Sequence, residues 1–178
     1  TADTGNYVKI YQDIGDASAT AILDTIDVKH NVMIDLNGHK LNNIKLGVNK
    51  LGVNKDVTLT LTGTAGSYVT QVYVRKGGGS FIIDSEANVE FNTIFVEDSA
   101  RLAVNDGAKV TTEQLTVIAS VNDDGTTTTS VKLATGMKLG GLTYHRQNNS
   151  GALKLGNLLD VTRQALRRED NGNYLDLY

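Results

Sequence analysis

Three carboxylates are the candidates for catalysis, because enzymes that cleave polysaccharides depend on acidic side chains. Hydrolysis needs two or three carboxylates converging on one site, and elimination needs an acidic calcium site beside a basic residue. Asp35 and Asp84 point outward from strand-like segments, but the matching positions of neighbouring segments hold Thr60 and Asn105. Glu97 ends a segment of a second series. We expect no catalytic site, and Asp35, Asp84 and Glu97 are the candidates if the chain is an enzyme.

The sequence contains no pattern for a metal or cofactor site. The spacing of His30, His39 and His145 matches no metal-binding motif, and the chain has no cysteine. The acidic loop at residues 122–125 lacks the spaced ligands and closing glutamate of an EF-hand. Residues 77–79 are three glycines with no helix after them, so we expect a flexible corner and not a phosphate loop. We therefore expect no metal and no cofactor.

The candidate binding site is a set of outward side chains on the second series of segments. Tyr73 and Phe95 each stand between two apolar residues that point inward, so both rings point outward. On adjacent strands the rings would lie about 4.8 Å apart. Arg75 stands beside Glu97 in the same alignment, and the neighbouring segments add further members. The full set is Lys45, Tyr73, Arg75, Phe95, Glu97, Thr116 and Ile118.

Two interpretations of this face remain open. Exposed aromatic rings beside hydrogen-bonding and charged groups suit stacking with a sugar or anchoring of a protein partner. Aromatic neighbours also stabilise a sheet by packing on each other, and that alone explains a pair of stacked rings.

A repeat positions these side chains. Residues 81–96 align with residues 102–117 at a uniform shift of 21, and six apolar positions coincide. In each copy the coinciding apolar positions recur at a spacing of two residues. This is the pattern that stacked coils of a parallel β-helix require, since equivalent inward side chains pack on each other.

Two interleaved series of strands extend the repeat along the chain. The first series starts at Val32, Val57, Phe81, Leu102, Val131 and Leu153, and the second starts at Ile44, Val72, Ile94, Leu115 and Leu142. They predict an all-β fold, a right-handed parallel β-helix that is a single-stranded solenoid of about six coils of roughly 21–25 residues. The duplicated LGVNKLGVNK at residues 46–55 and the loop at residues 122–129 are expected to bulge from the stack.

The ends of the chain differ from the coils. Residues 1–28 are expected to form a strand from Tyr7, a polar capping segment with room for a short helix, and a strand ending at Val28, and residues 29–154 the coils. Leucines at helical spacing in residues 155–178 precede an Asn171-Gly172 turn signal, which predicts a short helix and then a β-hairpin. The three parts would form one continuous domain.

Composition excludes several classes of partner. The net charge of −3 gives no field for gripping a nucleic-acid backbone, so we expect no nucleic-acid partner. No apolar run approaches the ~18 residues of a membrane span, so we expect no direct membrane insertion.

HNVMIDLNGHKL at residues 30–41, the coil repeats and LKLGNLLDVTRQALRREDNGNYLDLY at residues 153–178 resemble the right-handed parallel β-helix modules of bacterial, Gram-positive-like, cell-surface and secreted proteins. The resemblance implies extracellular display as part of a larger multidomain protein, and contact with a glycan or a host extracellular protein. The same scaffold is similar to pectate lyases, polygalacturonases, phage tailspikes and adhesins, so it does not identify the function.

The leading hypothesis is a non-catalytic extracellular module that binds or displays through its outward face. The alternatives are a fragment of a polysaccharide lyase or glycoside hydrolase, and a purely structural stalk.

Overall fold

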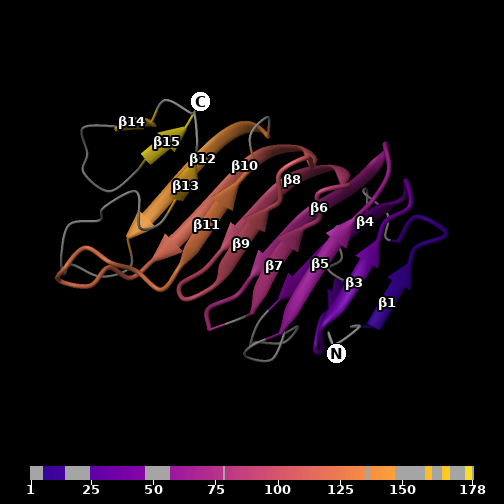
Figure 1. Ribbon diagram of the computed structural model, residues 1–178, viewed down its shortest axis with the longest axis horizontal. Helices are drawn as coiled ribbons and strands as arrows, with labels where there is room; N and C mark the ends of the chain where they lie inside the picture. Colours follow the sequence, from indigo (N-terminus) through magenta and orange to yellow (C-terminus); the bar gives the residue numbers. More distant parts are fainter. Residues whose placement is uncertain are drawn as a thin grey trace.

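The chain is all-β in the computed structural model shown in Figure 1. The structure describes residues 6–14, 25–46, 57–77, 79–134, 137–146, 159–161, 166–168 and 175–177. Within these ranges the regular elements are strands, and no helix occurs.

Most strands belong to two parallel sheets, and consecutive strands alternate between them (Figure 1). The odd-numbered sheet contains β1 (Asn6–Lys9), β3 (Val32–Asp35), β5 (Thr58–Thr62), β7 (Ser80–Ile83), β9 (Arg101–Val104), β11 (Ser130–Leu133) and β13 (Leu159–Val161). The even-numbered sheet contains β2 (Thr25–Asp27), β4 (Lys40–Leu46), β6 (Ser67–Val74), β8 (Asn88–Val96), β10 (Lys109–Ala119) and β12 (Lys138–Arg146). We call an odd-numbered strand and the even-numbered strand that follows it one level.

The predicted register is confirmed across the central levels. Phe81 pairs with Leu102, and Ile94 pairs with Leu115, as the 21-residue shift requires. The first-series strands predicted at Val32, Val57, Phe81, Leu102 and Val131 correspond to β3, β5, β7, β9 and β11.

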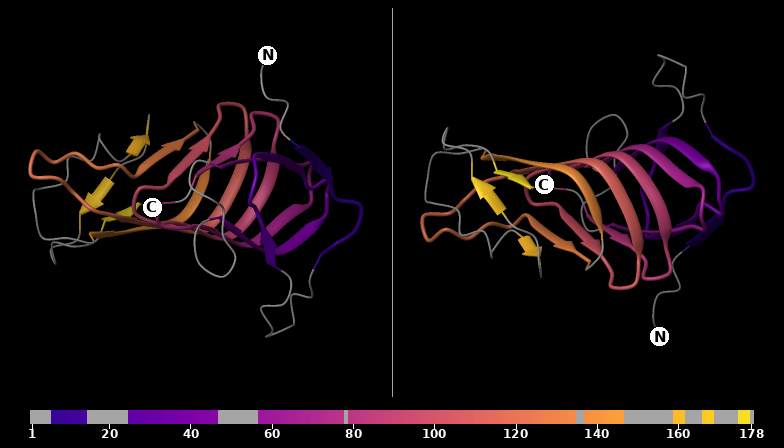
Figure 2. Two further views of the ribbon diagram at one scale, coloured as in Figure 1. Left: turned by 90° about the horizontal axis from the view of Figure 1, so that it is seen from below. Right: turned by 90° about the horizontal axis from the view of Figure 1, so that it is seen from above.

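The core lies between the two sheets, which Figure 2 shows as separate layers. Leu59, Phe81 and Leu102 occupy one register position on successive strands, and each is at most 1% exposed. Burying such a side chain stabilises the fold by about 1.5–3 kcal/mol. Val8 aligns with the buried Ile34 but is 44% exposed, because β1 is the end strand of its sheet.

The even-numbered strands bend near their middles. In β6, β8 and β10 the alternation of buried and exposed residues slips by one, at residues 70–71, 92–93 and 113–114. The pairing register is interrupted at the same places. Each of these strands therefore has a first arm before the bend and a second arm after it, which face in different directions.

The turn after each odd-numbered strand repeats from level to level. Its fourth residue donates a backbone hydrogen bond to its first residue, at 2.8–3.3 Å: His39 to Leu36, Ser67 to Thr64, Ala87 to Asp84, Ala108 to Asn105, and Met137 to Ala134. Gly66 and Gly107 have φ values of 92° and 99°, a left-handed conformation that favours glycine. The turns stack on each other as the strands do.

The C-terminal prediction is partly wrong. No helix lies in the described part of residues 155–178, and β13 occupies part of the segment predicted to be helical. Leucines spaced at helical intervals over a short polar stretch also suit a strand, and pairing with β11 favours the strand. The predicted hairpin strands are present as β14 (Leu166–Arg168) and β15 (Leu175–Leu177), which pair antiparallel. The first-series strand predicted at Leu153 lies outside the described residues.

Other predictions for the ends and bulges have mixed outcomes. The strands predicted near Tyr7 and before Val28 are confirmed as β1 and β2. The capping helix and most of the LGVNK duplication lie outside the described residues. The loop at residues 122–129 does project between β10 and β11, and its Asp124 Oδ1 accepts the backbone N–H and the hydroxyl of Thr126 at 2.9 and 2.6 Å.

In the corner before β7, which the glycines predicted to be flexible, Gly79 is tightly packed against Val57. A Cβ atom on Gly79 would lie 1.4 Å from the carbonyl oxygen of Val57, so no larger side chain fits there. The close approach allows Ser80 to donate a backbone hydrogen bond to that carbonyl at 2.9 Å.

We predict that Gly79→Ala destabilises the protein by roughly 1–3 kcal/mol or more, because the new methyl group forces β5 and β7 apart. Urea denaturation followed by circular dichroism would measure the loss. Gly77→Asn is the matched control, since Gly77 has φ 64° with open space where a side chain would extend, and asparagine tolerates this conformation. Equal stability of the two variants would contradict the packing argument.

Candidate functional site

The predicted aromatic pair is present on the second arms of β6 and β8. The rings of Tyr73 and Phe95 are stacked, with centroids 4.6 Å apart and planes inclined by 4°. Both side chains are half-buried, and the Tyr73 hydroxyl donates to Gln71 Oε1 at 3.1 Å. Each ring uses one face on the other ring. The second face of Phe95 is directed along the stack toward the level of Thr116.

The predicted ion pair flanks the rings. Arg75 Nη1 lies 3.1 Å from Glu97 Oε1, and Glu97 Oε2 accepts the backbone N–H of Lys76 at 2.8 Å. Glu97 therefore joins two successive turns. Because both of its oxygens are engaged, this carboxylate is held in one orientation beside the rings.

The other predicted members take their places by register. Thr116 pairs with Phe95, and Ile118 follows Val117, the partner of Val96. Thr116 and Ile118 are half-buried on the outward side. Lys45 pairs with Tyr73 through its backbone, and its side chain lies outside the described part of the structure.

A row of hydrogen-bonding side chains borders the rings on the other side. Gln71, Thr93 and Gln114 share one register position on β6, β8 and β10. Gln114 Nε2 donates to Thr143 Oγ1 at 2.9 Å on the next level. The second arms thus present aromatic, polar and charged side chains in three parallel rows.

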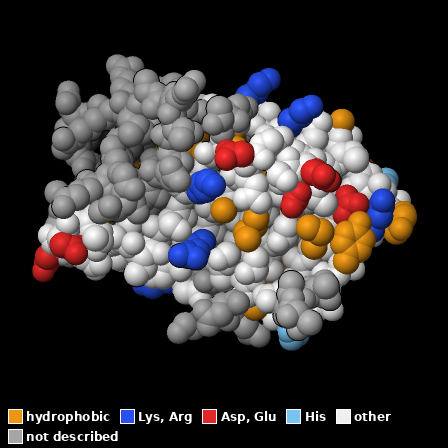
Figure 3. Space-filling view, viewed as in Figure 1, with side chains coloured by type: hydrophobic (Ala, Val, Ile, Leu, Met, Phe, Trp, Pro, Cys, Tyr) orange, Lys and Arg blue, Asp and Glu red, His pale blue; other side chains and the backbone are white. Residues whose placement is uncertain are grey.

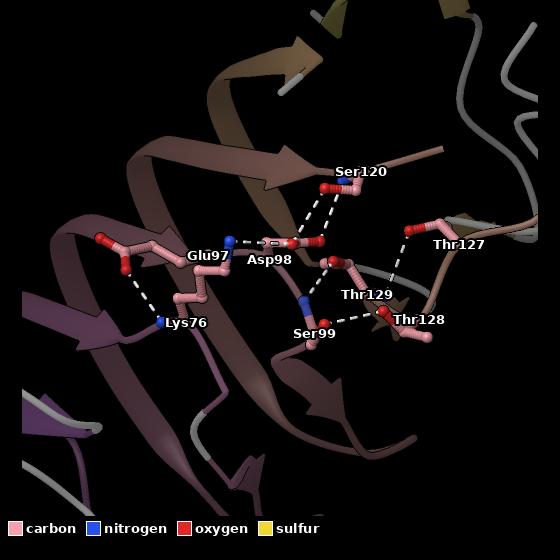
Figure 4. Close-up of polar contacts among 8 residues, drawn as sticks. All are labelled: Lys76, Glu97, Asp98, Ser99, Ser120, Thr127, Thr128 and Thr129. Atoms are coloured by element: carbon pink, nitrogen blue, oxygen red, sulfur yellow. Dashed lines mark hydrogen bonds and ion pairs between the residues drawn. The ribbon is translucent and has the colours of Figure 1, made fainter. Parts of the chain in front are cut away.

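A polar staple holds the corner next to this face, as Figure 4 shows. Asp98 is 6% exposed, and its carboxylate accepts the backbone N–H and the hydroxyl of Ser120, both at 2.9 Å. Lys76 Nζ lies 3.6 Å from the same carboxylate. Asp98 therefore ties together the turns of three successive levels.

The following residue continues this network (Figure 4). Ser99 has φ 63°, which is uncommon for a residue with a side chain. Its backbone N–H donates to Thr129 Oγ1 at 2.9 Å, and its hydroxyl lies 2.8 Å from Thr128 Oγ1. The threonines of the 122–129 loop thereby anchor the loop to the preceding level.

We predict that Asp98→Ala lowers the free energy of unfolding by roughly 1–3 kcal/mol, because two Ser120 donors lose their acceptor in a buried corner. Urea denaturation would measure the shift in midpoint at constant slope. Asp106→Ala, an exposed turn position on the next level, serves as the control and should change stability by less than about 0.5 kcal/mol. Similar losses in both variants would show that the staple contributes nothing specific.

The three candidate catalytic carboxylates do not converge. Asp35 and Asp84 lie on the odd-numbered sheet with one level between them, whereas Glu97 follows a strand of the even-numbered sheet. The residue aligned with Asp35 on the intervening strand is Thr62, not Thr60 as predicted, because Thr60 pairs with Met33. On the side drawn in Figure 3, some acidic side chains of the described residues lie near one another at the upper right, and others lie well apart from them.

Each of these two aspartates has a role in its turn. Asp35 Oδ1 accepts the N–H of Asn37 at 2.8 Å, and Asp84 Oδ1 accepts the N–H of Glu86 at 3.0 Å. An aspartate that bonds to the backbone two residues on stabilises a turn. Asp35 and Asp84 therefore occupy equivalent positions because the turn repeats, and not because they form one catalytic site.

Asp35 also contacts the first strand. Its Oδ2 accepts the Tyr7 hydroxyl at 2.9 Å and lies 3.6 Å from Lys9 Nζ. The hydrogen bond raises the pKa of the Tyr7 phenol above its ordinary value of 10.0, with smaller contributions from desolvation and from the negative charge of Asp35. A phenol whose pKa is raised on folding stabilises the fold below its unfolded-state pKa, and this contribution is lost as pH rises through the folded-state pKa.

We predict that Asp35→Asn lowers the pKa of Tyr7 toward 10.0, since the acceptor loses its charge. NMR titration of the tyrosine ring carbon signals, with Tyr7 assigned through Tyr7→Phe, would measure it. Asp84→Asn removes a charge two levels from Asp35 and three strands from Tyr7, so it should leave the pKa of Tyr7 unchanged. An identical Tyr7 titration in wild type and Asp35→Asn would refute the assigned cause.

Within the described ranges, no group of three or more His, Asp or Glu side chains is placed to hold a metal ion. His39 Nδ1 instead lies 3.2 Å from Asp13 Oδ1, which also accepts the backbone N–H of Lys40 at 3.0 Å. The backbone hydrogen bond from Lys40 is the largest cause of a lowered pKa for Asp13, and the hydrogen bond with His39 acts in the same direction. The pair is therefore a local contact at the start of the stack.

Sequence reasoning missed the outward row on the first arms. Lys40, Tyr68, Glu90, Thr111 and Lys138 share one register position on five successive strands. The one-residue slip at each bend reverses the alternation of buried and exposed residues. When the alternation of the second arm is extended back into the first arm, it therefore assigns these positions to the buried face. A separate reading of residues 67–69, 88–91 and 109–112 would have found the row.

Comparison of the chain with protein-family models, with curated proteins and with solved structures gives no match. In the part of the chain that the structure describes, no helix is long and apolar enough to cross a membrane.

Proposed function

We propose that the two sheets belong to a right-handed parallel β-helix, a single-stranded solenoid in which each level is one coil. The alternation of strands between two parallel sheets, the shared core and the repeated turns support this architecture. The right hand follows from the strong preference of parallel crossover connections for that hand.

We propose further that the chain is a non-catalytic extracellular module of a larger bacterial surface protein, and that it binds a glycan through the second arms of β6, β8 and β10. A host extracellular protein is the second candidate ligand. The observation that carries this proposal is the coplanar stack of Tyr73 and Phe95, which leaves one face of Phe95 toward the smaller Thr116. A sugar ring packs its apolar C–H face on such an aromatic face.

The surroundings of the rings supply polar contacts for the same ligand. Gln71 and Thr93 border the stack on one side, and the Arg75–Glu97 pair borders it on the other. Sugar hydroxyls need donors and acceptors held in fixed positions, and parallel strands hold them at intervals of about 4.8 Å. Rigid placement lowers the entropy cost of binding.

Glu97 lies on the other sheet from Asp35 and Asp84, and each aspartate accepts a backbone hydrogen bond within its own turn. Both observations weigh against a lyase or hydrolase, because acid/base cleavage needs carboxylates held on the two sides of one bond. A purely structural stalk would have the same solenoid fold but no ligand on the second arms. A binding experiment therefore distinguishes the stalk from the leading proposal.

We predict that Tyr73→Ala with Phe95→Ala lowers affinity at least tenfold for a glycan identified on a glycan array, because both stacking faces are lost. Isothermal titration calorimetry would measure the affinity, and circular dichroism would confirm that the variant is folded. A parallel assay against immobilised host extracellular-matrix proteins tests the second ligand class.

Met33→Ala with Ile82→Ala is the matched control. These two outward apolar side chains lie two levels apart on the odd-numbered sheet, so their loss removes apolar surface from a different face. If Tyr73→Ala with Phe95→Ala still binds the glycan with unchanged affinity, the second arms are not the binding site. If both double variants lose affinity equally, the loss is an indirect effect on folding.

A further inference from the structure

A hollow of about 540 Å³ opens on the first arms, away from the stacked rings. It is lined by the start of β8, the turn before β10, the start of β10 and Lys138 of β12. Sites for small ligands occupy about 300–1,000 Å³. The hollow therefore has the size for one or two sugar residues.

The register explains why the surface is hollowed here. Glu90, Thr111 and Lys138 share one outward row on β8, β10 and β12. Thr111 is short and stands between two long side chains, so the surface is lower at its level. Gly107 and Ala108 enter the same hollow from the turn and add no long side chain.

Three charged side chains surround this low point. Lys109 and Lys138 lie on adjacent strands, and Glu90 lies on the third. All three are exposed, and none has an ion-pair partner among the described residues. The backbones of Glu90 and Lys138 are two levels apart, about 9.6 Å at the usual strand spacing, and the two side chains form no ion pair with each other.

We propose that this hollow binds an acidic sugar residue within a glycan whose neighbouring sugar is neutral. The carboxylate or sulfate of the acidic sugar would lie between Lys109 and Lys138. Glu90 would accept hydrogen bonds from hydroxyl or amide groups of the neutral neighbour, and Thr111 with Asn88 would contact the ring hydroxyls. A run of consecutive acidic sugars is disfavoured, because one of them would face the Glu90 carboxylate.

This site is separate from the proposed glycan site on the second arms. The proposal for the hollow depends on the proposed function in one respect only, which is that the ligand is a glycan. Its lining residues do not include Tyr73 or Phe95, so the two sites can be tested independently.

The test is a titration of the full chain, by isothermal titration calorimetry or NMR, with three oligosaccharides. Hyaluronan hexasaccharide alternates a carboxylate sugar with a neutral one, a keratan sulfate hexasaccharide carries sulfate without carboxylate, and a chitin hexasaccharide is neutral. We expect binding of at least one acidic probe and none of the neutral probe. The two acidic arms show whether carboxylate or sulfate is preferred.

Lys109→Ala with Lys138→Ala should weaken binding of the acidic probe at least tenfold. The matched control is Arg101→Ala with Lys132→Ala, which makes the same change of net charge at exposed positions on β9 and β11. The control should retain the affinity, and so should Tyr73→Ala with Phe95→Ala. Absence of binding to both acidic probes, equal loss in the two charge variants, or equal binding of chitin would overturn the proposal.

Discussion

The structure depends on the packing of inward side chains on their equivalents one level away. Because strand side chains alternate with a period of two, a slip of one residue at any level would turn its apolar set outward. The buried column through Leu59, Phe81 and Leu102 shows how strictly this condition is met. Every outward row inherits its alignment from the inward rows, including the stacked rings of Tyr73 and Phe95.

The same dependence explains how much could be predicted from sequence. Where one alternation runs unbroken, as in the second arms, the register, the ring stack and the Arg75–Glu97 pair were all predicted and are confirmed. The bends at residues 70–71 and 92–93 break the alternation, and the row that includes Glu90 and Lys138 was missed there. The helix expected in residues 155–178 was wrong because short helical spacing of leucines does not outweigh pairing with a neighbouring strand.

Polar residues in the turns were the least predictable part. Asp98 has the sequence context of a solvated turn residue, yet its carboxylate is buried and bonded to Ser120. Gly79 has the context of a flexible position, yet it is required by the close approach of Val57. In both cases the decisive partner is about one level away in the chain, beyond the reach of any local pattern.

The staple at Asp98 has a mechanical consequence. Hydrogen bonds between parallel strands of a stack run along the stacking direction, so a force that separates the two ends loads neighbouring levels in series. Such an arrangement opens at its weakest interface. Asp98 contacts Lys76 on one side and Ser120 on the other, so it spans two interfaces at once. Under tension, a break at either interface must therefore also pull on this carboxylate, so the two interfaces are coupled and do not open independently.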